Sequence, residues 1–144
     1  PAGPGRKIKA YLFYVAPDGT RLMSVQREVP FAEGVDQARE IVAAQLEPVA
    51  DPLVSAIPTG TVLRALFITD SGEAYVDLSH EVSAGHSGGT LDELLTVYTI
   101  VDALTANLPA ITSVQILVEG RQVPTLAGHV DLRQPLVRNL SLVQ

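Results

Sequence analysis

Residues 90–108 carry the apolar periodicity that most restricts the fold of this chain. Apolar side chains recur there three or four residues apart, at Leu91, Leu94, Leu95, Tyr98, Val101, Leu104 and Leu108. That spacing places them on one side of an α-helix, and Pro109 limits the helix at its end. Such a stripe is stable only when it packs against other elements. The chain must therefore supply a matching apolar surface.

The start of this helix, Thr90-Leu91-Asp92-Glu93, fits a capping box. In that motif the threonine oxygen accepts a hydrogen bond from the backbone three residues on, and the glutamate reaches back to the threonine N–H. The two carboxylates also suit the positive end of the helix dipole. We expect Asp92 and Glu93 to serve the helix terminus.

A shorter helical stripe lies within residues 33–47. Its members include Val35, Ala38, Ile41, Val42 and Leu46. Pro48 ends it, and residues 48–60 hold three prolines without a regular period. We expect a loop there that returns the chain to a sheet.

The remaining regular stretches resemble strands. In residues 7–15, alternation would place Ile8, Ala10, Leu12 and Tyr14 on one face, and Asp18-Gly19 would turn the chain into a strand at about 22–29. Residues 62–69 are nearly continuously apolar, as in a central strand covered on both faces, and pair with an alternating strand around residues 74–78. Residues 114–118 predict a last long strand, with a short partner at 121–123.

This order of strands and helices predicts an α+β fold. We expect a two-layer sandwich in which a mixed β-sheet built from hairpins carries both helices on one face. Residues 7–136 would form the domain. Residues 1–6, which are rich in proline and glycine, would be a linker, and residues 137–144 a C-terminal tail.

Composition excludes several functions. The 144 residues suit a single domain, and the net charge of −6 without a dense Lys/Arg cluster argues against nucleic acid as a partner. The absence of cysteine excludes disulfides, thiolate zinc sites and cysteine nucleophiles. No apolar run approaches the roughly 20 residues of a membrane helix. We expect no cofactor.

The stretch Gly85-His86-Ser87-Gly88-Gly89 fits the G-x-S-x-G pattern of hydrolases. Ser87 as nucleophile and His129 as base, with Asp92 or Asp102 between them in sequence, would give a triad order. That motif needs a strand running straight into a strained turn and a helix, whereas here the strand ends several residues earlier. We interpret Ser87 as part of a solvated, flexible loop at 80–89, and keep a small serine hydrolase as an alternative.

A metal site is a further alternative. His80, Glu81 and His86 could ligate a divalent ion, with Asp77 or His129 completing the site. Zinc requires three or four converging ligands, and nothing in the sequence fixes these loop residues, so we expect exposed loop histidines and no metal. Asp102 lies between Val101 and Leu104 of the apolar helix. We expect it to flank the core and to accept a hydrogen bond from a nearby loop backbone.

Three segments resemble the GerMN domain, a module named from the spore germination protein GerM. They are IPTGTVLRALFITDSGEAYVDLSHEV (57–82), VYTIVDALTANLP (97–109) and VQILVEGRQVPTLAGHVDLRQPL (114–136). Their motifs occur together and in order. The chain departs from the family pattern at Glu47-Pro48, where Gly-Pro is usual, and at Asp102-Ala103, where Asn-Thr is usual.

The resemblance implies an extracytoplasmic, non-catalytic interaction or assembly module, found in bacterial lipoproteins and membrane-anchored proteins and similar to small ring-building modules of secretion-type assemblies. It implies a role linked to sporulation, germination or cell-envelope complexes, and envelope proteins as partners. Membrane attachment would come from a segment preceding this chain. The last segment would be a hairpin and its exit, in which Gly120 permits the turn and Gly128 a bend, while His129 and Asp131 fix the C-terminal segment or lie on a contact surface.

The candidate contact surface is the exposed face of the second helix and the loop before it. We expect Asp92, Thr96 and Thr99 on that face and Ser83 in the loop. A polar, weakly charged surface can pack on a neighbour without removing charges from water. The isolated domain would be monomeric or weakly self-associating. A periplasmic ligand-binding or metal-binding domain stays open as an alternative.

Overall fold

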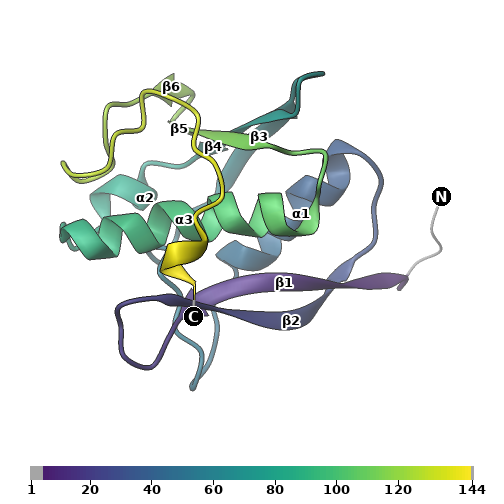
Figure 1. Ribbon diagram of the computed structural model, residues 1–144, viewed down its shortest axis with the longest axis horizontal. Helices are drawn as coiled ribbons and strands as arrows, with labels where there is room; N and C mark the ends of the chain where they lie inside the picture. Colours follow the sequence, from purple (N-terminus) through teal and green to yellow (C-terminus); the bar gives the residue numbers. More distant parts are fainter. Residues whose placement is uncertain (1–4, 144) are drawn as a thin grey trace.

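The computed structural model describes residues 5–143. Its longest helix, α3 (Thr90–Asn107), crosses the middle of the molecule beside α1 (Val35–Leu46), and a sheet lies on either side of the pair (Figure 1). The two helices begin and end within two residues of their predicted bounds. A short helix, α2 (Glu81–Ala84), precedes α3, so the region expected to be a flexible loop at 80–89 is in part helical.

Four strands form a mixed sheet in the order β3 (Leu63–Ile68), β4 (Glu73–Leu78), β5 (Ser113–Val118) and β6 (Arg121–Gln122). β4 runs antiparallel to β3 and parallel to β5, and β6 returns antiparallel to β5. The parallel pair requires a crossover, which α3 provides. Both α1 and α3 pack on one face of this sheet, which confirms the predicted α+β class and mixed sheet.

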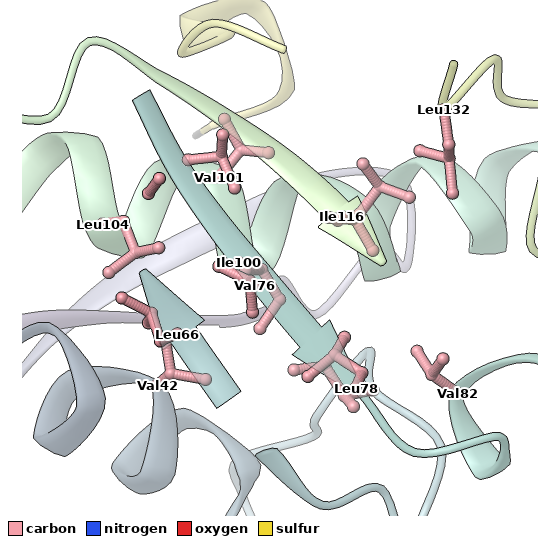
Figure 2. Close-up of a cluster of buried hydrophobic side chains, with 14 of the residues drawn as sticks. Val42, Leu66, Val76, Leu78, Val82, Ile100, Val101, Leu104, Ile116 and Leu132 are labelled. Carbon is pink, nitrogen blue, oxygen red and sulfur yellow. The ribbon is translucent and has the colours of Figure 1, made fainter. Parts of the chain in front are cut away.

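The core between helices and sheet is aliphatic. Val42 from α1, Leu104 from α3 and Val76 from β4 are fully buried in it, and Figure 2 shows the cluster from the sheet side. Leu132 reaches the same cluster from the C-terminal part of the chain. Burying each such side chain contributes about 1.5–3 kcal/mol relative to leaving it exposed.

The first hairpin forms a separate two-stranded sheet of β1 (Lys7–Val15) and β2 (Leu22–Pro30). It covers the side of the helices that faces away from the four-stranded sheet, and so adds a third layer (Figure 1). Of the four residues predicted to share one face, Ala10, Leu12 and Tyr14 are buried there, against Ile41 and Leu95 among others, and Ile8 is partly buried. α3 is therefore enclosed from two sides.

The free edge of β1 is closed by two side-chain amides. Gln45 Oε1 accepts from Phe13 N at 2.8 Å, and its Nε2 donates to Phe13 O at 2.7 Å. Asn107 makes the same pair of bonds with Tyr11, at 2.8 and 2.7 Å. Each amide imitates one residue of a neighbouring strand, and this removes an edge that could otherwise pair with another chain.

The predicted central position of the strand at 62–69 is wrong. β3 is an edge strand, and Phe67 on its outer face is 58% exposed. Only one face of the four-stranded sheet packs on helices. The apolar/polar alternation expected of such a strand is hidden in the sequence because Phe67, on the solvent face, is itself apolar.

The C-terminal residues lie on the domain. Leu136 pairs with Val114 of β5, and the chain then runs over α3 to a bridge between Val143 and Leu22 of the hairpin (Figure 1). A single 3-10 turn, η1 (Leu140–Leu142), lies in this segment. Of the expected linker, residues 1–4 lie outside the described part of the chain.

Candidate functional site

Glu93 is the centre of the most highly organised polar contact in the domain. Its side chain is fully buried on the sheet-facing side of α3. Oε2 accepts from the backbone N–H groups of Leu126 and Ala127 at 3.0 and 3.1 Å, and Oε1 accepts from that of His129 at 2.9 Å. The carboxylate thus organises the loop at 124–130, and the predicted capping box is wrong.

The hydrogen bonds outweigh the cost of burying this charge. Burial by itself raises the pKa of Glu93, but the backbone N–H groups of the loop at 124–130 lower it by more, and the net result is a pKa below its ordinary value. The carboxylate is therefore ionised at neutral pH. A buried charge with this many donors is a rigid anchor for the loop.

The anchored loop lies beside α2 and the first turn of α3 (Figure 1). Ser83 of α2 donates its hydroxyl to the Leu126 carbonyl, which ties the two segments together. Leu91, Asp92, Gly128 and His129 are exposed next to these contacts. We call residues 81–92 together with 125–130 the α2–α3 corner.

A cavity of about 500 Å³ opens at this corner, between α3, the turn after β1 and the loop at 54–59. Ser87 donates to Asp92 Oδ2 at 2.7 Å, and His86 Nε2 lies 3.0 Å from Thr96 Oγ1. Ser87, Asp92 and His86 line the cavity together with apolar groups from Ile57 and Leu95. Its size is within the range of roughly 300–1,000 Å³ that small-molecule sites occupy.

The structure does not assemble the serine hydrolase arrangement. Ser87 is exposed and bonds to Asp92, whereas His129 Nδ1 lies 3.2 Å from Glu93 Oε1. Asp102 lies further along α3, with its hydrogen bond to Asn139. The nucleophile and base of a triad must be within hydrogen-bond reach of each other, and here they have separate partners.

The candidate metal ligands are also separated. His80 Nε2 lies 3.4 Å from Glu81, while His86 contacts Thr96 and His129 contacts Glu93. Asp77 accepts from Gly120 N at 2.8 Å and so fixes the turn between β5 and β6. Within residues 5–143, no three histidine or acidic side chains converge as a metal site requires.

Two of the residues that we expected on the exposed face of the second helix are buried, so this part of the prediction is wrong. Thr96 is only 2% exposed and donates to Ala56 O at 2.6 Å, and Thr99 is fully buried and donates to Leu95 O at 2.7 Å. The hairpin and the loop at 54–57 cover this side of α3. Asp92 and Ser83 lie at the α2–α3 corner, where they retain access to solvent.

Asp102 has the role that its position predicted. It is fully buried, and its Oδ1 accepts from the backbone N of Asn139 at 3.1 Å. Oδ2 has no hydrogen-bond partner among the described residues. Burial raises the pKa of Asp102 to about 6, against the lowering effects of the Asn139 bond and the charge of Arg138.

Sequence reasoning missed the role of Glu93, although a signal for it exists. Glu93 precedes the buried Val97, Ile100, Val101 and Leu104 by 4, 7, 8 and 11 residues. That spacing places it on the buried stripe of the helix. A carboxylate at such a position needs buried donors, and the glycine-containing segment near His129 offers them.

Comparison with known proteins agrees with this architecture. The profile of the family Germane, described as sporulation and spore germination, matches residues 11–124, which is more than half of the chain. The chain belongs to the GerMN family. No curated protein sequence matches it.

Solved GerMN domains share the fold. The first GerMN domain of the sporulation protein GerM from Bacillus subtilis superposes with a TM-score of 0.69 at 18% identity, over 91% of this chain and 98% of that domain. The tandem GerMN domains of the same protein give 0.71 at 15% identity, over 94% of this chain and 48% of the pair.

A candidate lipoprotein from Clostridium perfringens gives a TM-score of 0.66 at 21% identity, over 95% of this chain and 91% of that chain. The GerMN family is linked to sporulation and is not known for enzymatic activity. In the described part of this GerMN domain, no helix has the length and apolar character to cross a bilayer.

Proposed function

We propose that this GerMN domain is a non-catalytic interaction module of the bacterial cell envelope, and that it binds a partner protein through the α2–α3 corner. The observation that carries the proposal is the buried Glu93 carboxylate. It holds the loop at 124–130 against α2 and α3, and so presents a surface from three separate chain segments in one fixed arrangement.

The composition of the corner supports protein binding. The corner exposes the apolar side chain of Leu91, which is 37% exposed, together with the polar groups of Asp92, Ser87 and His129. An apolar contact with a polar rim is typical of protein interfaces. Because the loop is already ordered, binding requires little further loss of conformational entropy.

The separation of Ser87 from His129 favours a binding role over hydrolysis. Each side chain has its own acidic partner, and the bond from Ser87 to Asp92 directs the hydroxyl toward a carboxylate, with His129 held elsewhere by Glu93. A carboxylate alone does not activate a serine in the way that an adjacent imidazole does.

An envelope location is part of the same proposal. It is supported by family membership and by the fold shared with a sporulation protein and a candidate lipoprotein. The domain would function outside the cytoplasm, where tethering raises the effective concentration of a weak partner.

Single-cysteine cross-linking tests the proposal, since this chain has no cysteine of its own. Leu91→Cys would carry a membrane-impermeant, thiol-reactive photo-cross-linker in intact cells. Phe67→Cys is the matched control because Phe67 is an exposed apolar residue on the four-stranded sheet. We expect a discrete cross-linked partner with the first variant and not with the second. Equal cross-linking from both positions, or from Phe67→Cys alone, would contradict the assignment of the corner.

A further inference from the structure

A second cavity lies beside the C-terminal segment, apart from the cavity at the α2–α3 corner. It measures about 190 Å³, and its walls come from β1, β2, α3 and residues 138–143. The two cavities share no lining residue. Tyr11, Phe13, Leu140 and Val143 make most of the smaller one apolar, and Tyr11 and Leu140 are themselves exposed at its surface.

One polar group in this cavity has no partner. Asp102 lines it, is fully buried, and uses only Oδ1, which accepts from Asn139 N. Oδ2 is the one buried side-chain oxygen or nitrogen in the described residues without a hydrogen bond. A buried carboxylate oxygen in apolar surroundings reduces the stability of the fold unless a donor reaches it. A ligand with a hydrogen-bond donor would supply the missing partner.

We propose that this cavity binds an aliphatic primary ammonium group, with the nitrogen donating to Asp102 Oδ2 and the alkyl chain lying between Phe13, Leu140 and Val143. The proposal does not depend on the proposed function at the α2–α3 corner.

The single carboxylate oxygen without a hydrogen bond determines which ligand chemistry fits. A guanidinium binds carboxylates best through two parallel bonds to both oxygens, and here Oδ1 is already occupied by the Asn139 backbone. An ammonium is a compact point charge that needs only one oxygen. The volume supports a short ligand, because at roughly 30 Å³ per water it corresponds to about six water molecules, which suits a chain of four or five carbons.

The surrounding charges are few. Arg138 lines the cavity and acts on Asp102 through its charge, and Tyr98 and Tyr11 are the other titratable groups near it. The charge of Arg138 opposes an incoming cation. The C-terminal segment over the cavity is held by the Asn139 bond and the Val143–Leu22 bridge.

The test is an NMR titration of the ¹⁵N-labelled domain with n-butylammonium, with n-butanol as the neutral isostere. We expect saturable shifts of the Tyr11, Phe13 and Asn139 amides with the amine only. Binding should strengthen as the pH rises from 5 to 7.5, because the ionised carboxylate is the binding form. Asp102→Asn should weaken binding at least about tenfold, which corresponds to about 1.4 kcal/mol. Asp70→Asn, an exposed turn residue, should leave it unchanged.

Two further variants keep the test decisive if Asp102→Asn folds poorly. Ala106→Leu would fill the cavity without touching the carboxylate, and should also prevent binding. Arg138→Gln should bind at least as tightly as the original chain. A blocked Leu-Lys-Leu peptide distinguishes the source of the ammonium, since saturable binding of the peptide would indicate a partner's lysine and binding of butylammonium alone a free amine. Absence of saturable shifts with both probes, or equal shifts with butanol, would overturn the proposal.

Discussion

Glu93 Oε1 lies 2.9 Å from the backbone nitrogen and 3.2 Å from the imidazole Nδ1 of His129, although the two residues are 36 positions apart. With the two bonds at Oε2, this contact joins the first turn of α3 to the last loop of the domain. The loop has no strand or helix of its own, and the Glu93 carboxylate holds it together with the Ser83 bond to the Leu126 carbonyl.

Replacing Glu93 should destabilise the domain much more than replacing a glutamate on the surface. Glu93→Ala leaves three backbone N–H groups without their acceptor, and we expect a loss on the order of 3 kcal/mol. Urea unfolding measures the change. Glu33→Ala, on an exposed residue, is the control and should remain within about 0.5 kcal/mol. Equal effects of the two changes would contradict the anchor role.

The Glu93 anchor also predicts acid sensitivity. The pKa of Glu93 is lower in the folded chain than its ordinary value of 4.5. Its contribution is therefore fully present above pH 4.5 and is lost as the pH falls through the lower folded value. The unfolding free energies of the original chain and of Glu93→Gln should approach each other progressively as the pH falls below 4.5. A constant difference between pH 3 and pH 7 would exclude this linkage.

Asp102 predicts the opposite pH dependence. Burial raises its pKa from 3.8 to about 6, so the folded state binds the proton more tightly than the unfolded state. The favourable contribution is complete below pH 3.8 and is lost as the pH rises through 6. Asp102→Asn should therefore become more stable relative to the original chain between pH 4 and pH 7.5, by up to about 3 kcal/mol. A difference that does not change with pH would show that the carboxylate is not perturbed.

Gln45 tests whether side-chain amides close the hairpin edge. Gln45→Met keeps the approximate size but removes both bonds to Phe13, and we expect a loss of about 2–4 kcal/mol together with concentration-dependent self-association. Gln134→Met is an exposed control. Unfolding at two protein concentrations and sedimentation provide the measurement. A stable, strictly monomeric Gln45→Met domain would argue that the edge needs no cover.

The sequence predicts the elements well because their signals are local. Asp18-Gly19 is sufficient for the first hairpin, and Pro48 and Pro109 end the helices near their observed limits. The position of Asp102 within an apolar stripe also predicts its bond to a loop backbone, because a carboxylate in such a place needs a donor. These inferences depend on residues close together in the chain.

The errors concern positions whose environment is set by distant segments. Thr96 and Thr99 look exposed when α3 is assumed to have one open side, but the hairpin packs there as a separate layer. Phe67 looks like a core residue although β3 is an edge strand. Glu93 fits a capping box locally, and only the position of the loop at 124–130 shows its actual partners.

In the proposed function, Glu93 shapes the α2–α3 corner into a binding surface. The most direct measurement is the partner cross-linking yield from Leu91→Cys when it is combined with Glu93→Gln or with the control Glu33→Gln. We expect the yield to fall at least about fivefold with Glu93→Gln, equivalent to roughly 1 kcal/mol of lost binding, and to stay unchanged with Glu33→Gln at equal amounts of folded domain. An unchanged yield in the folded Glu93→Gln domain would contradict the account.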